Sequence, residues 1–192
     1  MGRELERKYR ADQAVLSAVE KKFGDFTPIS METVYYDTED RALGKRHWTL
    51  RRRYENGVSV CTLKTPLPDG SRGEWEAGCG DIMEAIPKLC KQGGPEELLT
   101  LTAGGVAPSC GARFTRLAKT LVLESCTVEL ALDSGVLLGG GREQPLCELE
   151  MEYKSGDETA ALLFARLLAN EFSLERETKS KVARALELVS ER

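Results

Sequence analysis

The segment Glu4-Leu5-Glu6-Arg7-Lys8 decides the fold, because its charged residues recur at alternate positions. Side chains two residues apart in a β-strand point to the same face, so Glu4, Glu6 and Lys8 would lie side by side. Two carboxylates beside an ammonium can hold a hard divalent cation next to a phosphate oxygen. A single strand of this kind is more often a solvated sheet face, so the functional interpretation depends on whether other strands repeat the pattern.

The composition is typical of a globular protein of about one domain. The chain has 192 residues, of which 41% are hydrophobic and 30% charged, and its formal net charge is −4. This negative charge argues against a nucleic-acid-binding protein. The sequence has no apolar run of membrane-spanning length, and its N-terminus, charged from Arg3, has no signal-peptide core. We therefore expect a cytoplasmic protein without a nucleic-acid or membrane partner.

Cysteine and histidine usage limits the kinds of site that the chain can build. The six cysteines are Cys61, Cys79, Cys90, Cys110, Cys126 and Cys147. They form no C-x-x-C pair, so their spacing fits neither a zinc knuckle nor a small disulfide scaffold, and reduced thiols are expected. His47 is the one histidine, and its place between Arg46 and Trp48 favours a structural role at the start of a strand. A metal site would therefore be mostly oxygen-ligated, which favours Mg²⁺, Mn²⁺ or Ca²⁺ over zinc.

Hydrophobic periodicity and turn residues predict a chain of β-hairpins with inserted and appended helices. Asn56-Gly57 is a strong hairpin turn signal, whereas Gly104 to Gly111 is expected to be a loop and Gly139-Gly140-Gly141 a mobile connection. This order favours a mainly antiparallel α+β fold over a parallel α/β sheet. Strands are predicted at 3–10, 32–37, 47–54, 58–65, 71–78, 112–124, 126–133, 136–138 and 146–154, and helices at 12–23, 82–92, a short segment from 95, 157–171 and 179–190.

Several predicted strands carry their charged residues on one face. Carboxylates stacked at i and i+2 repel each other unless cations lie between them. If the sheet closes, the charged faces form its interior and the apolar faces point outward beneath the helices. A barrel interior lined by both positive and negative side chains is costly to desolvate. Such an interior suits a water-filled tunnel that holds a polyanion and metal ions. The alternative is an ordinary one-sided sheet with its polar face in water. The charged positions are Arg51 and Arg53; Lys64; Arg72, Glu74 and Glu76; Glu129 and Asp133; and Glu148, Glu150, Glu152 and Lys154.

Taken in order, these motifs resemble the CYTH family, also called triphosphate tunnel metalloenzymes, over nearly the whole chain. The family's mid-chain arginine falls on Arg116, although Arg113 competes for this role. No single motif is specific, but eight in the same order are. The matching residues are Glu4, Glu6 and Lys8; Arg51 and Arg53; Leu63 and Lys64 with Pro66; Arg72, Glu74 and Glu76; Arg116; Glu129 to Asp133; Cys147 to Glu152; and Lys179 to Lys181.

The resemblance implies an eight-stranded closed β-barrel, the triphosphate tunnel, with helices packed outside it. Residues 1–192 would form a single tunnel domain, with a helical insertion at 81–103 and C-terminal helices at 157–190. Members of the family depend on Mg²⁺ or Mn²⁺ and act on triphosphate-bearing substrates. The His-Phe pair often found upstream of the first strand in cyclase-type members is missing, and residues 147–156 resemble the tripolyphosphatase branch.

The function implied by the resemblance is metal-dependent hydrolysis of the terminal phosphoanhydride of inorganic triphosphate. A thiamine triphosphatase, a class IV adenylate cyclase and a non-catalytic polyphosphate- or nucleotide-binding module are the alternatives. The partner would be a small polyanion, and either a monomer or a homodimer is compatible with the sequence. Glu152 stays open as a rim or surface residue, and Lys154 is expected in solvent.

The resemblance also assigns site residues. The expected metal ligands are Glu4, Glu6, Asp133, Glu148 and Glu150. The expected catalytic residues are Glu4, Glu6, Lys8, Glu76 and Asp133. The residues expected to bind the triphosphate are Lys8, Arg51, Arg53, Lys64, Arg72, Arg116, Lys179 and Lys181.

Overall fold

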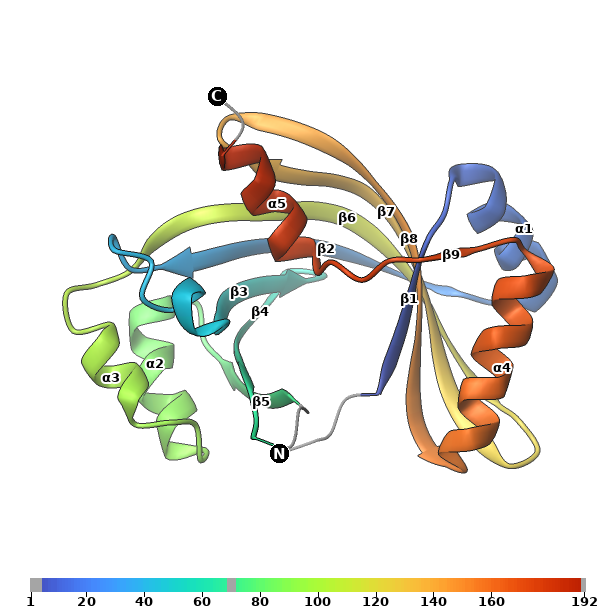
Figure 1. Ribbon diagram of the computed structural model, residues 1–192, viewed down its shortest axis with the longest axis horizontal. Helices are drawn as coiled ribbons and strands as arrows, with labels where there is room; N and C mark the ends of the chain where they lie inside the picture. Colours follow the sequence, from blue (N-terminus) through green and yellow to red (C-terminus); the bar gives the residue numbers. More distant parts are fainter. Residues whose placement is uncertain (1–4, 69–71, 191–192) are drawn as a thin grey trace.

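A strongly curved antiparallel sheet of nine strands forms the body of the protein (Figure 1). The computed structural model describes residues 5–68 and 72–190. The strand order is β5-β4-β3-β2-β6-β7-β8-β1-β9, and each neighbouring pair is antiparallel. The strands are β1 Glu6–Arg10, β2 Thr27–Asp37, β3 Thr49–Glu55, β4 Val58–Pro66, β5 Arg72–Gly78, β6 Ala107–Val122, β7 Cys126–Gly139, β8 Arg142–Gly156 and β9 Glu175–Arg176.

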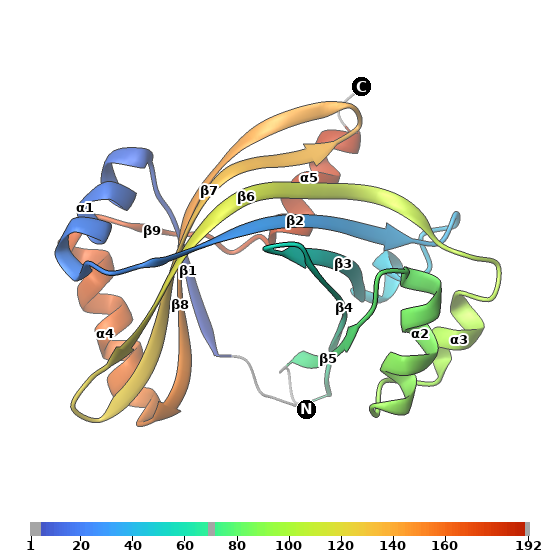
Figure 2. The ribbon, with the colours of Figure 1, turned by 180° about the vertical axis from the view of Figure 1, so that it is seen from behind.

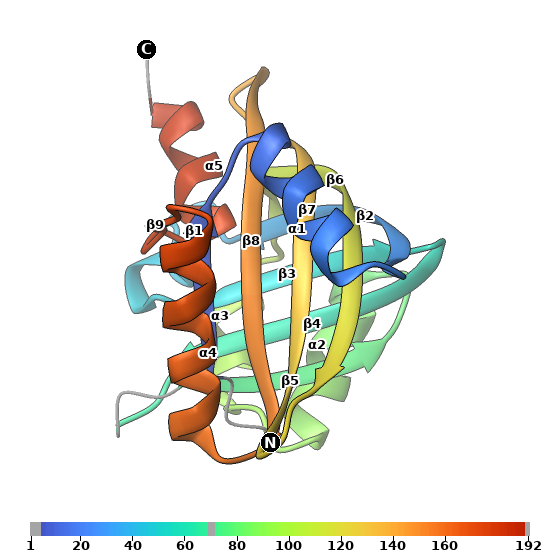
Figure 3. The same cartoon turned by 90° about the vertical axis from the view of Figure 1, so that its right-hand side faces the viewer.

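Helices cover both ends of the curved sheet (Figure 2). The α1 and α4 helices pack on the outer face of β7 and β8 (Figure 3), whereas α2 and α3 lie beside β3 to β5. This arrangement confirms the predicted mainly antiparallel α+β class. No helix in the described ranges has the length and apolar character needed to cross a bilayer. The helices are α1 Gln13–Phe23, a 3₁₀ turn η1 Gly44–Arg46, α2 Ile82–Lys91, α3 Glu97–Leu101, α4 Glu158–Glu171 and α5 Lys181–Ser190.

On several strands the apolar residues between the charged positions point outward, as their alternation predicts. On β7, Val128, Leu130 and Leu132 are buried against α1 and α4. Trp75 on β5 is buried in a second core beneath α2 and α3. Burying a leucine completely contributes roughly 2 kcal/mol relative to leaving it exposed. Because these outer faces are covered, the charged positions of the same strands are left on the concave face.

The expected closed eight-stranded barrel needs correction, because the sheet of described residues is open. Its edge strands are β5 and β9, and no pairing joins β5 to β1. The outer edge of β1 instead pairs with β9, through Tyr9 opposite Arg176 and Arg10 opposite Glu175. The N–H of Glu177 also donates to the Lys8 carbonyl at 2.9 Å. These contacts occupy the main chain of β1 at the edge where closure would have to occur.

The helix cap and the hairpin turn that were predicted from adjacent residues are confirmed. Asp12 caps α1 by accepting a hydrogen bond from the Val15 N–H at 2.8 Å. Asn56 and Gly57 both have positive φ in the β3–β4 turn, as a tight hairpin requires. Two expectations were wrong: the loop predicted over 104–111 already contains the start of β6, and β7 runs unbroken through the gap predicted after residue 133.

The last helix, α5, lies beneath the arch of β7 and β8 (Figure 1). Ala185 and Leu188 pack against inward-facing residues of the sheet, among them Phe114 and Leu137. Gly139 permits this close approach, because a Cβ at that position would overlap the Ala185 carbonyl oxygen. Helix α5 therefore fills one end of the concave face and places its first residues beside the charged strands.

Candidate active site

The concave face encloses a cavity of about 790 Å³, within the usual range for small-molecule sites. Every strand from β1 to β8 and the start of α5 contribute to its wall, and most of the contributing side chains are charged. Its cationic lining residues are Lys8, Arg51, Arg53, Lys64, Arg72, Arg116, Lys154 and Lys181. Its acidic lining residues are Glu6, Glu55, Glu74, Glu76, Glu129, Glu150 and Glu152.

One side of the cavity, formed by β3, β4 and β5, is the basic wall. The Arg51 side chain is 3.9 Å from Glu74, and the Lys64 ammonium is 3.2 Å from the same carboxylate. Arg53 pairs with Glu55 on its own strand. The Nε atoms of Arg51 and Arg53 are buried and have no hydrogen-bond partner among the described residues. These guanidinium groups therefore keep donor capacity for an anion in the cavity.

The two cavity-facing arginines of β3 lie close to each other. Burial and the neighbouring Arg51 guanidinium lower the pKa of Arg53 below its usual range. An anion bound between them would relieve this repulsion. Arg52, between them in the sequence, lies on the opposite face and donates to the Gly80 carbonyl at 3.0 Å. Strand parity thus separates two arginines of the cavity from one of the outer surface.

The opposite side, formed by β7, β8 and β1, is the acidic wall. Glu6 lies opposite Glu152 in the β1–β8 pair, and Glu152 lies opposite Glu129 in the β8–β7 pair. These three residues form an acidic row across the sheet. The Lys154 ammonium lies 2.8 Å from Glu152 and 3.5 Å from Glu129. Carboxylate oxygens aligned in this way are the donors that Mg²⁺ and Mn²⁺ prefer.

A second acidic group lies deeper in the protein. One carboxylate oxygen each from Asp133, Glu148 and Glu150 lies within 4.8 Å of the other two, a spacing that suits a cation. Asp133 and Glu148 lie on the same concave face but are fully buried under Lys181 and Arg184, whereas Glu150 also lines the cavity. Each of the three also contacts cationic side chains of the protein itself, so the spacing alone does not make this group a metal site.

Arg116, Lys181 and Arg184 neutralise these deeper carboxylates. Arg116 binds both oxygens of Asp133 at 2.7 Å and also pairs with Glu150. The Lys181 ammonium is 2.8 Å from both Asp133 and Glu150. Burial alone would lower the pKa of Lys181, but Glu150 and the other carboxylates raise it above its usual range.

Burial affects the two glutamates of this group differently. It raises the pKa of Glu148, whose ionised form is only partly compensated by Lys181. Burial also opposes ionisation of Glu150, but Lys181 and Arg116 outweigh that effect and hold its pKa well below the usual range. Glu150 is therefore the member of the deeper group that is held as an anion at the cavity surface.

The floor between the two walls is mostly apolar. Met31 of β2 and Phe114 of β6 are cross-strand neighbours that line it, together with Tyr35. Phe114 and Tyr35 are only 7% and 5% exposed. Neither ring therefore presents an open face on which a base could stack. The Lys181 ammonium lies 5.2 Å from the centre of the Phe114 ring, which supports this side of the α5 N-terminus.

The structure brings most of the predicted site residues to one cavity. Arg116 faces it, whereas Arg113 is exposed and pairs with Glu143 at 3.3 Å, which resolves the alternative between them. The two arginines point to opposite faces because they are an odd number of positions, three, apart on β6. The predicted residues that line the cavity are Glu6, Lys8, Arg51, Arg53, Lys64, Arg72, Glu76, Arg116, Glu150 and Lys181.

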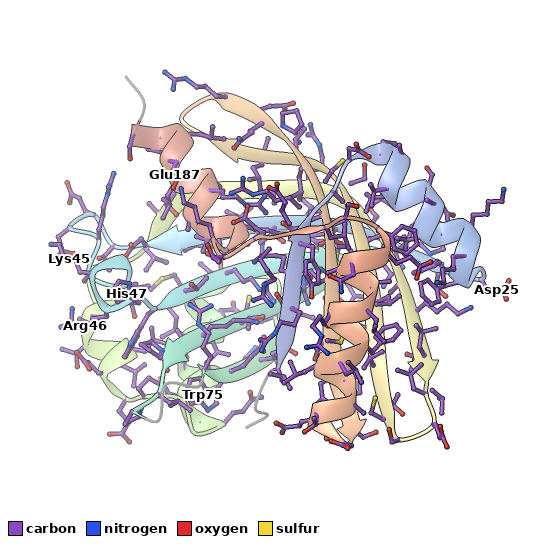
Figure 4. All side chains as sticks on the ribbon, turned by 45° about the vertical axis from the view of Figure 1, so that its right-hand side comes forward. Asp25, Lys45, Arg46, His47, Trp75 and Glu187 are labelled. Carbon is purple, nitrogen blue, oxygen red and sulfur yellow. The ribbon has the colours of Figure 1, made fainter. Side chains whose placement is uncertain are left out.

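Other predicted site residues lie elsewhere. Glu4 is outside the described residues. Lys179, expected to bind the triphosphate, does not line the cavity: it is exposed and pairs with Glu187 at 2.7 Å. It precedes α5 in a bend, so its side chain does not follow that of Lys181. Figure 4 shows His47 beside Lys45 and Arg46 at the outer edge of the molecule.

Four residues of this region carried no role in the sequence-based assignment: Glu74, Glu129, Glu152 and Arg184. Strand parity places the first three on the charged faces but gives them no metal, catalytic or phosphate role. Arg184 follows Lys181 by three residues, which places both on one face of α5. Its contact with Glu148 depends on how α5 docks, and the sequence carries no signal for that.

Together the fold and the cavity define a mainly antiparallel α+β protein whose concave face carries a site lined by both positive and negative side chains. The chain belongs to the CYTH family, since the CYTH domain model matches residues 2–186. It is 28% identical over 152 residues to an inorganic triphosphatase of Haemophilus influenzae, a match that covers 78% of this chain and 43% of that protein. The chain thus spans less than half the length of this curated relative.

Solved structures of low sequence identity share the fold. A candidate adenylate cyclase from Bacillus halodurans superimposes with a TM-score of 0.64 at 20% identity, over 96% of this chain and 98% of that one. HpAC1 from Hippeastrum, described as having a dominant triphosphatase activity, gives a TM-score of 0.63 at 18% identity, over 96% and 95% of the two chains. At these sequence identities the structural similarity supports the fold alone. The activity has to be inferred from the residues of the cavity.

Proposed function

We propose that this protein hydrolyses the terminal phosphoanhydride of inorganic triphosphate with the help of a divalent cation. The observation that carries the proposal is the basic wall of β3 to β5 facing the acidic wall of β7, β8 and β1 across one cavity. A triphosphate bound with metal ions presents both signs of charge, so it needs a site with both. The similarity to the Haemophilus influenzae triphosphatase supports the same reaction class.

The basic wall would hold the phosphates. Arg51 and Arg53 offer planar groups that can bind phosphate oxygens in pairs, and Lys64 adds a point charge on the next strand. Ser180 and the first two residues of α5, Lys181 and Val182, line the cavity, and the free N–H groups of a helix N-terminus favour an anion. The Ser180 hydroxyl caps α5 by accepting from the Ala183 N–H at 3.1 Å.

The acidic row would hold the cation. Its three carboxylates, Glu6, Glu129 and Glu152, and the neighbouring Glu150 are oxygen donors on adjacent strands that line the cavity, so the donor set fits Mg²⁺ or Mn²⁺. A bound divalent cation supplies Lewis-acid polarisation of phosphate oxygens and a lower pKa for a coordinated water.

The remaining steps fall to side chains of the chain itself. Lys8, opposite Glu150 in the sheet, would meet a phosphate oxygen next to the metal. Arg51 and Arg53 would stabilise the negative charge that develops on the leaving phosphate. Glu76 lines the cavity and accepts a hydrogen bond from the Thr62 hydroxyl at 3.1 Å, and we assign to it the acceptance of a proton from the attacking water. No covalent nucleophile is required.

The character of the floor favours an inorganic over an organic triphosphate. A nucleoside or thiamine group would need an exposed aromatic face for stacking. The two rings that line the cavity, Phe114 and Tyr35, are almost completely buried. The charged walls, by contrast, match the repeating phosphates along the whole cavity.

A direct assay tests this proposal. The purified chain is incubated with tripolyphosphate, thiamine triphosphate or ATP, each with Mg²⁺, Mn²⁺ or EDTA. Phosphate, pyrophosphate and cyclic AMP are then measured. We expect cation-dependent release of phosphate from tripolyphosphate at a kcat/KM well above that for the organic substrates. Turnover of only an organic substrate would refute the substrate assignment, and tight tripolyphosphate binding without turnover would indicate a sensor.

A further inference from the structure

Six buried or half-buried charged side chains form one connected cluster between the acidic wall and the start of α5, which we call the α5 anchor. Three are carboxylates from β7 and β8, and three are cations from β6 and α5. They balance in charge and contact one another directly. The members of the α5 anchor are Asp133, Glu148, Glu150, Arg116, Lys181 and Arg184.

Lys181 lies at the centre of the α5 anchor. Its ammonium contacts one oxygen each of Asp133, Glu148 and Glu150. Two of the three ammonium donors bond Glu148 and Glu150, and Asp133 adds an ion pair at 2.8 Å. Lys181 therefore serves to join α5 to β7 and β8.

Arg184 completes the charge balance from the side of α5 that faces β9. One of its nitrogens binds the Glu148 oxygen that Lys181 leaves available. Another lies 3.8 Å from Glu177, which also accepts a hydrogen bond from Arg10 at 2.9 Å. Glu148 is fully buried, and without Arg184 the three carboxylates would face only two cations.

We propose that Arg184 is a positioning residue: it holds Glu148 and Lys181 in the α5 anchor, so that Asp133 and Glu148 dock α5 and do not bind the divalent cation. This inference rests on the proposed function for the role of the acidic row. Glu150 belongs to both groups, because it is bound by the anchor and also open to the cavity. Arg184 thus acts on the metal site through Glu150 without touching substrate.

Removing one partner leaves a buried charge unpaired, whereas removing both restores the balance. Arg184→Gln leaves one excess negative charge close to Glu150 and should therefore lower Tm and tighten Mn²⁺ binding by about threefold. Glu148→Gln leaves one excess positive charge and should lower Tm while weakening Mn²⁺ binding by a similar factor. The double variant has two carboxylates and two cations, so Tm should recover in part and Mn²⁺ affinity should return to the wild-type value.

The experiment measures Tm by calorimetry and Mn²⁺ binding by electron paramagnetic resonance for the wild type, both single variants and the double variant. An unchanged Mn²⁺ affinity in Arg184→Gln would show a purely structural role and overturn the proposal. A loss of Mn²⁺ affinity of about tenfold or more in the double variant would make Glu148 a metal ligand and also overturn it. If the wild type binds no Mn²⁺, the proposed metal site is refuted and the positioning role falls with it. Additive Tm losses in the double variant would independently refute the anchor.

Discussion

Glu6 on β1 and Glu152 on β8 are directly opposed on the cavity face of an antiparallel pair. Glu129 continues the same row on β7, and the Lys154 ammonium lies beside both Glu152 and Glu129. Like charges directly opposite each other destabilise a sheet. A divalent cation would convert this repulsion into attraction, which makes the acidic row a place where metal binding and stability are coupled.

Glu152→Gln should weaken the stabilisation of the protein by Mg²⁺. A cation that binds only the folded state raises Tm with its concentration, and loss of one ligand should weaken binding by about tenfold. Thermal unfolding across a Mg²⁺ series measures the effect. Glu143→Gln is the matched control, because Glu143 is on the same strand but pairs with Arg113 on the surface. Equal responses of the two variants would remove Glu152 from the metal site.

The three consecutive arginines of β3 provide an internal control for phosphate binding. Arg51→Gln and Arg53→Gln each remove a charge from the cavity, and loss of a charge-assisted hydrogen bond should raise KM for tripolyphosphate by about tenfold or more. Arg52→Gln should leave KM close to the wild-type value, because Arg52 bonds the Gly80 carbonyl on the outer face. Steady-state kinetics with tripolyphosphate measure KM for the three variants. A large increase in KM for Arg52→Gln would contradict the assigned strand parity.

Glu177 should make stability depend on acid pH. Burial alone would raise its pKa, but the Lys179 N–H and Arg10 outweigh burial and hold it below 4.5. A carboxylate with a lowered folded-state pKa contributes its full stability above the unfolded-state pKa, and this contribution is lost as pH falls through the folded-state value. Glu177→Gln should therefore cost about 1 kcal/mol or more at pH 7.

The difference between wild type and Glu177→Gln should shrink as the pH falls below 4.5. Urea unfolding of both proteins between neutral pH and about pH 3 gives the two free energies. Other carboxylates titrate in both proteins, so the difference isolates Glu177. A difference that grows on acidification would contradict the assigned direction of the pKa shift.

Gly139→Ala should displace α5 and destabilise the protein. The added Cβ would overlap the Ala185 carbonyl oxygen, and overpacking of this kind costs about 2 kcal/mol. Gly141→Ala is the control in the same turn: its φ of 75° strains a side chain, but nothing lies within 4 Å of the added atom. Chemical denaturation should show the larger loss for Gly139→Ala, and hydrogen exchange should show it concentrated in α5. Equal losses would mean that close packing at Gly139 does not fix α5.

The buried thiols should resist alkylation. All six cysteines are free, and burial raises the pKa of Cys61 and of Cys110 to about 11. Only the thiolate reacts with iodoacetamide, so at pH 8 these two should be modified last. Peptide mass spectrometry over a time course gives the order. Early modification of Cys61 or Cys110 would show that the sheet opens locally.

The sequence was most informative where side-chain parity decides the outcome. Arg51 and Arg53 were predicted to face one side of a strand and do so, and Val128, Leu130 and Leu132 of β7 point outward as expected. The identity of the cavity-facing arginine on β6 was left open, because alternation is poor there. The pairing of β6 with β2 and β7 places Arg116 opposite Asp133 on the cavity face and resolves that choice.

Contacts between segments far apart in the sequence could not be predicted. The pairing of β9 with β1 uses only two residues of each strand, which is too short for a pattern. The division of the acidic residues into a cavity row and the α5 anchor depends on where Lys181 and Arg184 arrive when α5 docks. No local propensity encodes that position.

The docking of α5 also has a consequence for the order in which the protein can assemble. Asp133 and Glu148 are buried only when Lys181 and Arg184 arrive to compensate them. A nascent chain that has completed β8 but not α5 holds two strands whose carboxylates have no cationic cover from that helix. Contacts of such long sequence separation form slowly. The two carboxylates on the hairpin of β7 and β8 therefore stay hydrated until α5 docks, and docking of α5 completes this side of the cavity.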